Sequence, residues 1–296
     1  MSIRAIHEVA APAKLNLFLH VVGRRADGYH LLQSAFVLID WCDTLHFERR
    51  DDARLTRHDL SARLPDDDLC LRAARLLQFE SRTPLGADIS IDKQVPWGAG
   101  MGGGSSDAAS TLLALNRLWG LNWPLDRLLA LGLKLGADVP FFLAGHNAWV
   151  EGIGERLTPL TLPALGFAVV KPAASLETRG IFESPLLARN TAAVILAGFL
   201  ADDGVAALCQ GFGHNDLQPP AQSQCTEVAQ AAQWLQARFG NSRMTGSGSA
   251  VFARTRSLDA TLGRPMATMP PDLPAGWVGR MCRSLKQHPL AGWASG

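Results

Sequence analysis

Residues Pro96 to Ser106 have the sequence P-W-G-A-G-M-G-G-G-S-S, which places five glycines and two serines between a predicted strand and a predicted helix. Glycine has no Cβ, so such a loop can adopt positive φ values and point its amide N–H groups at one centre, where phosphate oxygens would lie. The helix expected from about Ser106 onward would present its N-terminal dipole to the same centre. The loop therefore predicts a phosphate-binding site.

Three other interpretations of this loop fit the sequence less well. A flexible linker joins polar segments without periodicity, whereas Ala87 to Asp92 alternates and an apolar helical pattern follows the loop. Gly98, Gly100 and Gly103 match the dinucleotide pattern G-x-G-x-x-G, but that pattern normally follows a continuously apolar, buried strand. The P-loop pattern fails, because no lysine follows the last glycine. We therefore expect a different way of holding phosphate.

Length and composition indicate a globular protein of about two domains: 296 residues, 47% of them hydrophobic and 19% charged. The net charge is +1 and the basic residues are scattered, which argues against nucleic acid and anionic membranes as partners. No apolar stretch approaches the roughly 20 residues that span a bilayer. We expect a cytoplasmic enzyme without a membrane partner.

The cysteines indicate neither a disulfide framework nor a zinc site, because they are odd in number, widely spaced and include no C-x-x-C pair. We expect reduced and mostly buried thiols. The five residues are Cys42, Cys70, Cys209, Cys225 and Cys282.

The first half of the chain mixes predicted strands with predicted helices. Alternation over Lys14 to Leu19 and over part of Phe36 to Asp40 predicts strands joined by a turn at Gly28. The acidic run Asp66 to Asp68 supplies an N-cap for a helix from about Leu69 to Phe79. This half therefore begins as an antiparallel sheet that acquires a helical layer.

The second half predicts a smaller α+β unit. A strand is expected over Gly166 to Lys171, and helices near Ala192 to Leu200 and Thr226 to Arg238. The glycine-rich stretch Thr245 to Ser249 predicts a hairpin turn or strand entry. A closing strand near Trp277 to Cys282 would complete a ferredoxin-like arrangement.

Two isolated charged residues stand in apolar surroundings, Lys14 and Asp138. Burial of either charge alone would be unfavourable, so each is expected to have a partner. Each also has a purely structural interpretation. Asp138 stands two residues before Pro140 and is a good helix N-cap, and Lys14 would suit the surface of an edge strand. The two residues alone leave these alternatives open.

Three ordered stretches together resemble the GHMP kinase family: Pro12 to Leu17, Pro96 to Ser106, and Thr245 to Gly248. The resemblance implies an α+β, two-domain GHMP kinase fold, with an N-terminal domain like ribosomal S5 domain 2 and a ferredoxin-like C-terminal domain. Residues 1–160 would form the ATP-binding domain with the phosphate loop. Residues 161–296 would form the C-terminal domain, which contributes to substrate binding. ATP and Mg²⁺ are the expected cofactors.

Within this family, Pro12 to Leu19, Arg25 to His30 and Leu135 to Pro140 resemble the members that act on a diphosphocytidyl derivative of methylerythritol. Mevalonate kinases look different, with A-P-G-K followed by a G-E-H turn, which this sequence lacks. The resemblance implies phosphorylation of the 2-hydroxyl of 4-diphosphocytidyl-2-C-methyl-D-erythritol, in the non-mevalonate route to isoprenoid precursors.

The resemblance also implies catalytic roles. Asp138 would be the base toward the substrate hydroxyl, and Lys14 would orient it and stabilise charge in the transition state, which suits phosphoryl transfer. Lys93 would lie near the adenine side, and Ser105 or Ser106 would reach a phosphate or magnesium. The backbone amides from Gly98 to Ser106 would hold the ATP phosphates. Besides Lys93, the residues expected to bind ATP are Pro96, Trp97, Gly98, Ala99, Gly100, Met101, Gly102, Gly103, Gly104, Ser105 and Ser106.

Substrate binding is expected at a second group of residues. Tyr29 is the only tyrosine of the chain, and the resemblance makes it a platform for cytosine, since stacking contributes roughly 1–3 kcal/mol per base. Phe182 would be the opposing ring, His30 would recognise the base, and Asn16 would lie near the diphosphocytidyl or erythritol part. The structural alternatives are a half-buried turn aromatic for Tyr29 and a core residue for Phe182.

The chain departs from the family pattern in two places. Asp107 stands where some members carry a neutral residue, which adds negative charge near the loop, although an acid at a helix N-terminus is also favourable. Residues 183–224 match only loosely, so no contact is inferred there.

The rival functions are another GHMP-type kinase, a non-catalytic nucleotide-binding regulator and a dehydrogenase. We expect a monomer or weak homodimer.

Overall fold

The computed structural model describes residues 3–255 and 268–295 of the chain. Strands dominate the first fifty residues, and helices and strands alternate after them. The bounds, in chain order, are β1 Ala5–Arg24, β2 His30–Arg50, β3 Leu55–Asp59, α1 Leu69–Ser81, β4 Gly86–Asp92, α2 Gly103–Leu118, α3 Leu125–Leu135, α4 Val139–Ala144, β5 Ala148–Gly152, β6 Arg156–Pro159, β7 Gly166–Lys171, α5 Thr178–Glu183, α6 Leu196–Ala201, α7 Gly204–Gln210, α8 Gln218–Gln224, α9 Thr226–Phe239, β8 Arg243–Met244, β9 Val251–Thr255 and β10 Val278–Arg283.

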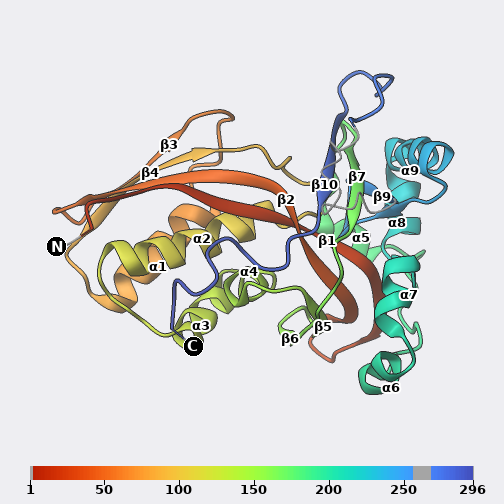
Figure 1. Cartoon of the computed structure of the whole chain (residues 1–296), viewed down its shortest axis with the longest axis horizontal. Helices are drawn as coiled ribbons and strands as arrows, with labels where there is room; N and C mark the ends of the chain where they lie inside the picture. The colour runs from red at the N-terminus through yellow and green to blue at the C-terminus, as the bar shows by residue number, and fades with distance from the viewer. Residues whose placement is uncertain (1–2, 256–267, 296) are drawn as a thin grey trace.

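The long strands β1 and β2 form one antiparallel hairpin that extends across most of the molecule (Figure 1). The predicted turn at Gly28 is confirmed, since Gly28 has a φ of 91° and the Arg25 amide donates to the Tyr29 carbonyl. The other edge of β2 pairs with β4 and β5, which gives the order β3-β4-β2-β5-β6 with β1 on β2. The half-buried strand before the loop, β4, is antiparallel to β2 as expected. Strand β3, however, runs parallel to β4.

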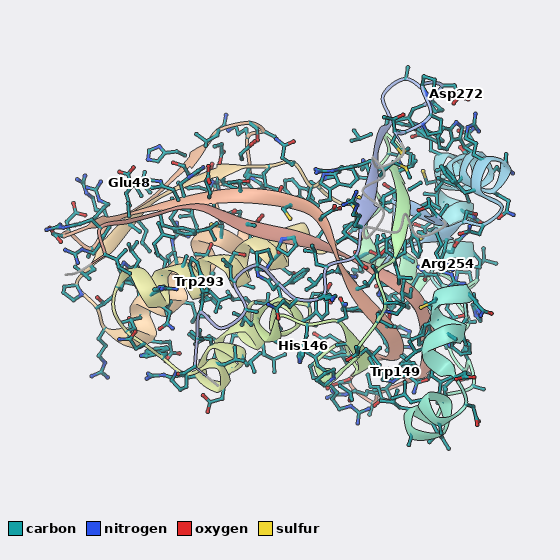
Figure 2. The ribbon with its side chains drawn as sticks, viewed as in Figure 1. Glu48, His146, Trp149, Arg254, Asp272 and Trp293 are labelled. Atoms are coloured by element: carbon teal, nitrogen blue, oxygen red, sulfur yellow. The ribbon has the colours of Figure 1, made fainter. Side chains whose placement is uncertain are left out.

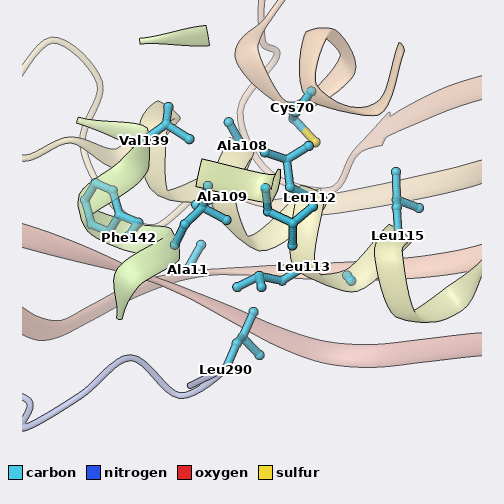
Figure 3. Packing of buried hydrophobic residues seen from close by; sticks show 14 of the residues in the cluster. Ala11, Cys70, Ala108, Ala109, Leu112, Leu113, Leu115, Val139, Phe142 and Leu290 are labelled. Atoms are coloured by element: carbon cyan, nitrogen blue, oxygen red, sulfur yellow. The ribbon is translucent and has the colours of Figure 1, made fainter. Parts of the chain in front are cut away.

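Helix α2 lies at the centre of the first core, and nearly all of its residues are buried. Its small residues Ala108 and Ala109 let the neighbouring elements approach closely, with Cys70 of α1 on one side and Phe142 of α4 on the other (Figure 3). The helix begins at Gly103, three residues before the predicted start. The last two glycines of the loop therefore belong to the first turn of the helix, behind a left-handed Gly102 with a φ of 71°.

The second sheet is antiparallel throughout and has the order β10-β7-β9-β8. Helix α9 packs on it through Val228, Ala231 and Leu235, and both lie on the same side of the molecule (Figure 1). The predicted strand Gly166 to Lys171 is confirmed as β7. The turn predicted over Thr245 to Ser249 is also confirmed, because it joins β8 to β9.

One predicted helix is shorter than expected. Of the segment Ala192 to Leu200, only the part from Leu196 onward is helical, as α6. The preceding amides are used elsewhere: Thr191 donates to the Val21 carbonyl, and Val194 donates to the Gln33 side chain. Hydrogen bonds to the long hairpin therefore replace the first turn of that helix.

A group of buried residues joins the two sheets. It combines Leu15 and Val37 of the long hairpin with Phe167 and Phe252 of the second sheet, and Met101 of the glycine loop packs among them. The loop is thus held between the sheets. Because both halves of the chain contribute to this core, the division at residue 160 stays a prediction.

The segment that follows β10 returns to the first sheet and its helices. The His288 amide donates to the Gly145 carbonyl, and the Arg117 guanidinium lies 4.9 Å from the centre of the Trp293 ring. Figure 2 places Trp293 beside the helices that cover the first sheet. The end of the predicted second domain therefore packs on the first.

Candidate active site

The side chains of Lys14 and Asp138 meet beside the glycine loop, with 3.7 Å between Lys14 Nζ and Asp138 Oδ2. The Lys14 side chain is only 4% exposed, whereas 31% of the Asp138 side chain is exposed. Burial lowers the pKa of the Lys14 ammonium, and the negative charge of Asp138 opposes that shift. The pair therefore combines a desolvated ammonium with a carboxylate that a ligand can reach.

The structure decides between the interpretations of these two residues. A surface position for Lys14 is wrong, because the residue is buried and its ammonium lies 4.4 Å from the centre of the Phe36 ring. Asp138 does occupy the N-cap position of α4. Its side chain, however, makes no capping hydrogen bond within the described part of the chain. The Asp138 carboxylate thus remains available for other interactions.

Asn16 connects the first predicted motif with the third. Its Oδ1 accepts hydrogen bonds from Lys14 Nζ (2.6 Å), Thr245 Oγ1 (3.1 Å) and the Gly246 amide (2.9 Å). Its Nδ2 donates to Ser34 Oγ at 3.0 Å. Because the side chain is buried and so fully engaged, Asn16 orients the Lys14 ammonium from a fixed position.

The glycine loop and the β8–β9 turn touch through their backbones. A Cβ on Gly100, whose φ is 71°, would lie 2.2 Å from the Thr245 carbonyl oxygen, and a Cβ on Gly246 would lie 2.6 Å from the Gly100 oxygen. The Ser249 amide donates to the Gly98 carbonyl at 3.2 Å. Glycine is required at this crossing because no side chain fits between the two turns.

The loop lines a cavity of about 480 Å³. Neither Lys14 nor Asp138 lines this cavity, but a Cβ on Gly102, which does, would lie 3.3 Å from Lys14 Cγ, so the Lys14 side chain lies against the cavity wall. Trp97 is 65% exposed at the cavity. Residues outside the predicted loop also line it: Leu64, Pro65, Asp67, Asp68, Leu69, Lys93, Val95, Asp107 and Thr178.

Lys93 lies in the wall of this cavity, but two buried carboxylates bind its ammonium, those of Asp43 and Asp107. Burial raises the pKa of Asp107 to about 8, because Lys93 only partly offsets the loss of hydration and Asp43 adds repulsion. Asp107 is thus buried beside the loop, and its raised pKa reduces the negative charge that the sequence suggested there. Sequence reasoning missed Asp43, which belongs to no motif.

Three of the predicted substrate residues, Tyr29, His30 and Phe182, lie around the tip of the long hairpin, whereas Asn16 lies beside Lys14. Tyr29 is 61% exposed, so its ring is free to bind a ligand. Phe182 stacks on His30, with ring centroids 5.1 Å apart, and does not face Tyr29 directly in the described structure. Burial and the charges of Arg189 and Arg24 lower the pKa of His30, which favours the neutral imidazole.

Arg189 is a further residue that sequence reasoning missed, because it lies in the loosely matching region. Its guanidinium donates to His30 Nε2 at 3.3 Å and to the carbonyls of Phe182, Ser184 and Leu187 at 2.9–3.1 Å. The residue therefore ties the hairpin tip to the segment after α5. No motif in the sequence points to it.

The cysteines and the possible metal ligands complete the chemical inventory. All five cysteines are free thiols, but only Cys70 and Cys282 are buried, so the expectation of mostly buried thiols is wrong for the other three. Within the described ranges, no cluster of three or more His, Cys, Asp or Glu residues is arranged to hold a metal ion. Helices long and apolar enough to cross a membrane are also absent from those ranges.

The family comparison agrees with this geometry. The model of the GHMP kinase N-terminal domain matches residues 68–146, and that of the GHMP kinase C-terminal domain matches residues 201–261. The chain belongs to the GHMP kinase family and is therefore a kinase. The predicted α+β GHMP kinase fold is confirmed.

Two relatives that align with nearly the whole chain carry the same name. A 4-diphosphocytidyl-2-C-methyl-D-erythritol kinase of Methylibium petroleiphilum is 66% identical, over 99% of this chain and 100% of its own. The protein of the same name from Albidiferax ferrireducens is 56% identical, over 98% and 96% of the two chains.

Solved structures show the same relationship. A crystal structure of 4-(cytidine 5'-diphospho)-2C-methyl-D-erythritol kinase superposes with a TM-score of 0.72 at 36% identity, covering 83% of this chain and 88% of that one. A homoserine kinase from Cytophaga hutchinsonii shares the fold, with a TM-score of 0.65 at 19% identity over 96% of both chains.

Proposed function

We propose that the chain transfers the γ-phosphate of ATP to the 2-hydroxyl of 4-diphosphocytidyl-2-C-methyl-D-erythritol, and that this step serves the non-mevalonate route to isoprenoid precursors. Relatives with the corresponding name align over nearly the whole chain at 66% and 56% identity. The structural observation that carries the chemistry is the Lys14–Asp138 pair, because its Lys14 side chain lies against the wall of the glycine-lined cavity.

ATP binding is supported by the kinase family and by the cavity. The proposed phosphate ligands are the backbone amides from Gly98 to Ser106, together with the N-terminus of α2, which carries a partial positive charge. The exposed ring of Trp97 and the apolar side chains of Leu64 and Leu69 offer a surface for the nucleoside end.

Mg²⁺ belongs to the proposal because the residues at the start of α2 fit it. Ser106 Oγ is buried and has no hydrogen-bond partner among the described residues, and Ser105 lines the cavity. A hydroxyl oxygen is a suitable ligand for this hard cation, which otherwise relies on the phosphates and water. Bound Mg²⁺ would neutralise charge on the phosphate oxygens during transfer.

Asp138 and Lys14 would perform the transfer together. The exposed part of the Asp138 carboxylate accepts the hydrogen bond of the substrate hydroxyl and takes its proton as the new P–O bond forms. The bond between the γ-phosphorus and the β–γ bridging oxygen breaks in the same transfer, and ADP leaves. The Lys14 ammonium, held by Asn16, lies beside that carboxylate and faces the developing charge. Catalysis then depends mainly on positioning and electrostatics.

The cytidyl end of the substrate would bind at the hairpin tip. Tyr29 offers an exposed ring for stacking, and His30 and Phe182 form a stacked pair next to it. We propose that His30 recognises the cytosine base and that Phe182 provides the second aromatic ring beside it. Asn16, which is hydrogen-bonded to Lys14, would lie next to the erythritol part of the substrate.

A substrate panel tests the proposal. Purified chain is incubated with ATP, Mg²⁺ and one acceptor at a time, and ADP release is measured for the cytidyl compound, mevalonate and homoserine. We expect turnover with the cytidyl compound to exceed the others by orders of magnitude. Preference for mevalonate or homoserine would assign another GHMP kinase activity, and ATP binding without turnover would indicate a regulator. Binding of a nicotinamide cofactor would favour a dehydrogenase.

We also propose that the enzyme works in the cytoplasm as a monomer or weak homodimer and binds no nucleic acid. Five unpaired thiols suit a reducing compartment. A net charge of +1 provides no field that would attract nucleic acid. Sedimentation at several protein concentrations measures the association state, and a stable higher oligomer would contradict this part of the proposal.

A further inference from the structure

Three buried charged side chains meet next to the glycine loop: Asp43 of β2, Lys93 after β4, and Asp107 of α2. Their side chains are 0%, 9% and 3% exposed. The Lys93 ammonium donates to both carboxylates, at 2.7 Å in the case of Asp107 Oδ2. We call these residues the loop brace. They touch neither Lys14 nor Asp138, so the proposed catalytic step does not account for them.

Asp43 holds the segment that enters the loop. Its Oδ1 accepts hydrogen bonds from two successive amides, Gln94 at 2.6 Å and Val95 at 2.7 Å, and its Oδ2 accepts the Lys93 ammonium. One fully buried carboxylate therefore binds three consecutive residues immediately before Pro96. Because Asp43 belongs to a central strand of the sheet, it fixes this end of the loop to the most rigid part of the fold.

Lys93 connects that end of the loop to the other. Lys93 lies three residues before Pro96, and Asp107 follows directly after Ser106. The hydrogen bond between their side chains therefore links the segment before the loop to the residue after it. The ammonium also lies 3.4 Å from the position that a Cβ on Gly103 would take, directly behind the first turn of α2. The brace thus closes the loop at its base, and Lys93 and Asp107 also form part of the cavity wall.

The brace is unfavourable as a source of stability alone. Two carboxyl groups share one ammonium in a buried site, and Asp107 Oδ1 has no hydrogen-bond partner among the described residues. Buried ion pairs of this kind often add little to stability compared with apolar packing. The loop brace is better explained by the geometry that it imposes on the glycine loop.

We propose that Asp43, acting through the amides of residues 94–95 and through Lys93, is a positioning residue that sets the glycine loop for the phosphates of ATP. This assignment rests on the proposed role of the loop, and it replaces direct adenine contact as the main role of Lys93. Nucleotide affinity should then depend on Asp43 even though Asp43 itself contacts no nucleotide.

The test compares two variants of the full chain that each remove one carboxyl group from the loop brace. Asp43→Ala and Asp107→Asn each leave Lys93 with one carboxyl partner, but only Asp43→Ala removes the acceptor for the loop amides. We expect Asp43→Ala to weaken ADP binding, measured by calorimetry, and to raise KM for ATP on the order of tenfold, with KM for the cytidyl acceptor unchanged. Asp107→Asn should lie much closer to the wild type in both measurements.

Asp40→Asn is the matched control, because Asp40 lies on the same strand and binds the Arg283 amide, away from the loop. If Asp43→Ala does not fold, the isosteric Asp43→Asn replaces it. That variant keeps an acceptor for the loop amides and loses the ion pair with Lys93, so we expect a smaller rise in KM for ATP than for Asp43→Ala. Equal ADP affinity in wild type and the Asp43 variant would overturn the inference, as would equal rises in both KM values. Failure of the wild type to bind ADP would instead refute the proposed function.

Discussion

Lys14 Nζ and Asp138 Oδ2 lie 3.7 Å apart, although 124 residues separate them in the chain and only one of the two side chains is accessible. The ammonium is buried, and the carboxylate is about one-third exposed. This asymmetry suits a proton acceptor that meets the substrate while its counter-charge stays fixed behind it. The first prediction follows from it.

Replacing the carboxylate should stop the chemistry and preserve nucleotide binding. We expect Asp138→Asn to lower kcat by about 10²–10⁴-fold, since it removes a general base without changing the side-chain shape. ADP affinity should stay at the wild-type value. Asp126→Asn, in the first turn of α3, is the control. A variant with full turnover would show that Asp138 is not the base.

The crossing of the two glycine turns should be intolerant of a methyl group. Gly100→Ala places a Cβ 2.2 Å from the Thr245 carbonyl, so we expect a large loss of stability and a higher KM for ATP. Gly120→Ala is a matched control: its φ of 67° resembles the 71° of Gly100, but its Cβ would meet nothing within 4 Å among the described residues. Urea unfolding should separate the contact from the backbone strain. Equal destabilisation of the two variants would argue against a tight crossing.

Arg189 should matter for the cytidyl acceptor and not for ATP. Because its guanidinium binds the His30 ring and the carbonyl of Phe182, we expect Arg189→Gln to raise KM for the acceptor about tenfold while KM for ATP stays constant. Arg179→Gln, which removes an exposed arginine paired with Glu183, is the comparison. Similar kinetics in the two variants would remove Arg189 from the substrate site.

Acid should destabilise the protein partly through His288. Burial lowers the pKa of this histidine to about 4, and its Nδ1 accepts the Leu290 amide. Between about pH 6.5 and pH 4 the unfolded chain gains a proton at this residue and the folded chain does not. The free energy of unfolding should therefore fall as the pH falls through that window, by on the order of 3 kcal/mol from this residue.

The measurement is urea unfolding at pH 7 and pH 5 for the wild type and His288→Gln. The variant should lose less stability between the two pH values. Part of the dependence should persist, because burial also lowers the pKa of His20 to about 4. Parallel losses in both proteins would contradict the assignment to His288.

Much of the fold was predictable from local pattern. The Gly28 turn, strand β7, the β8–β9 turn and the Asp68 N-cap of α1 follow from spacing and residue type, and the structure confirms them. The missing first turn of α6 was not predictable. Its amides bind the long hairpin instead, and such distant partners leave no local signal.

The sequence by itself determined the chemical groups of the site: the glycine loop, Lys14, Asp138 and the single tyrosine, each marked by a residue type unusual in its surroundings. Only the tertiary structure decided how these groups are held. Asp43, Asn16 and Arg189 bind atoms from distant segments, and the fold places the Lys93 ammonium between two buried carboxyl groups. The physical reason is that hydrogen bonding and desolvation depend on which segments the fold brings together, and sequence spacing does not record that.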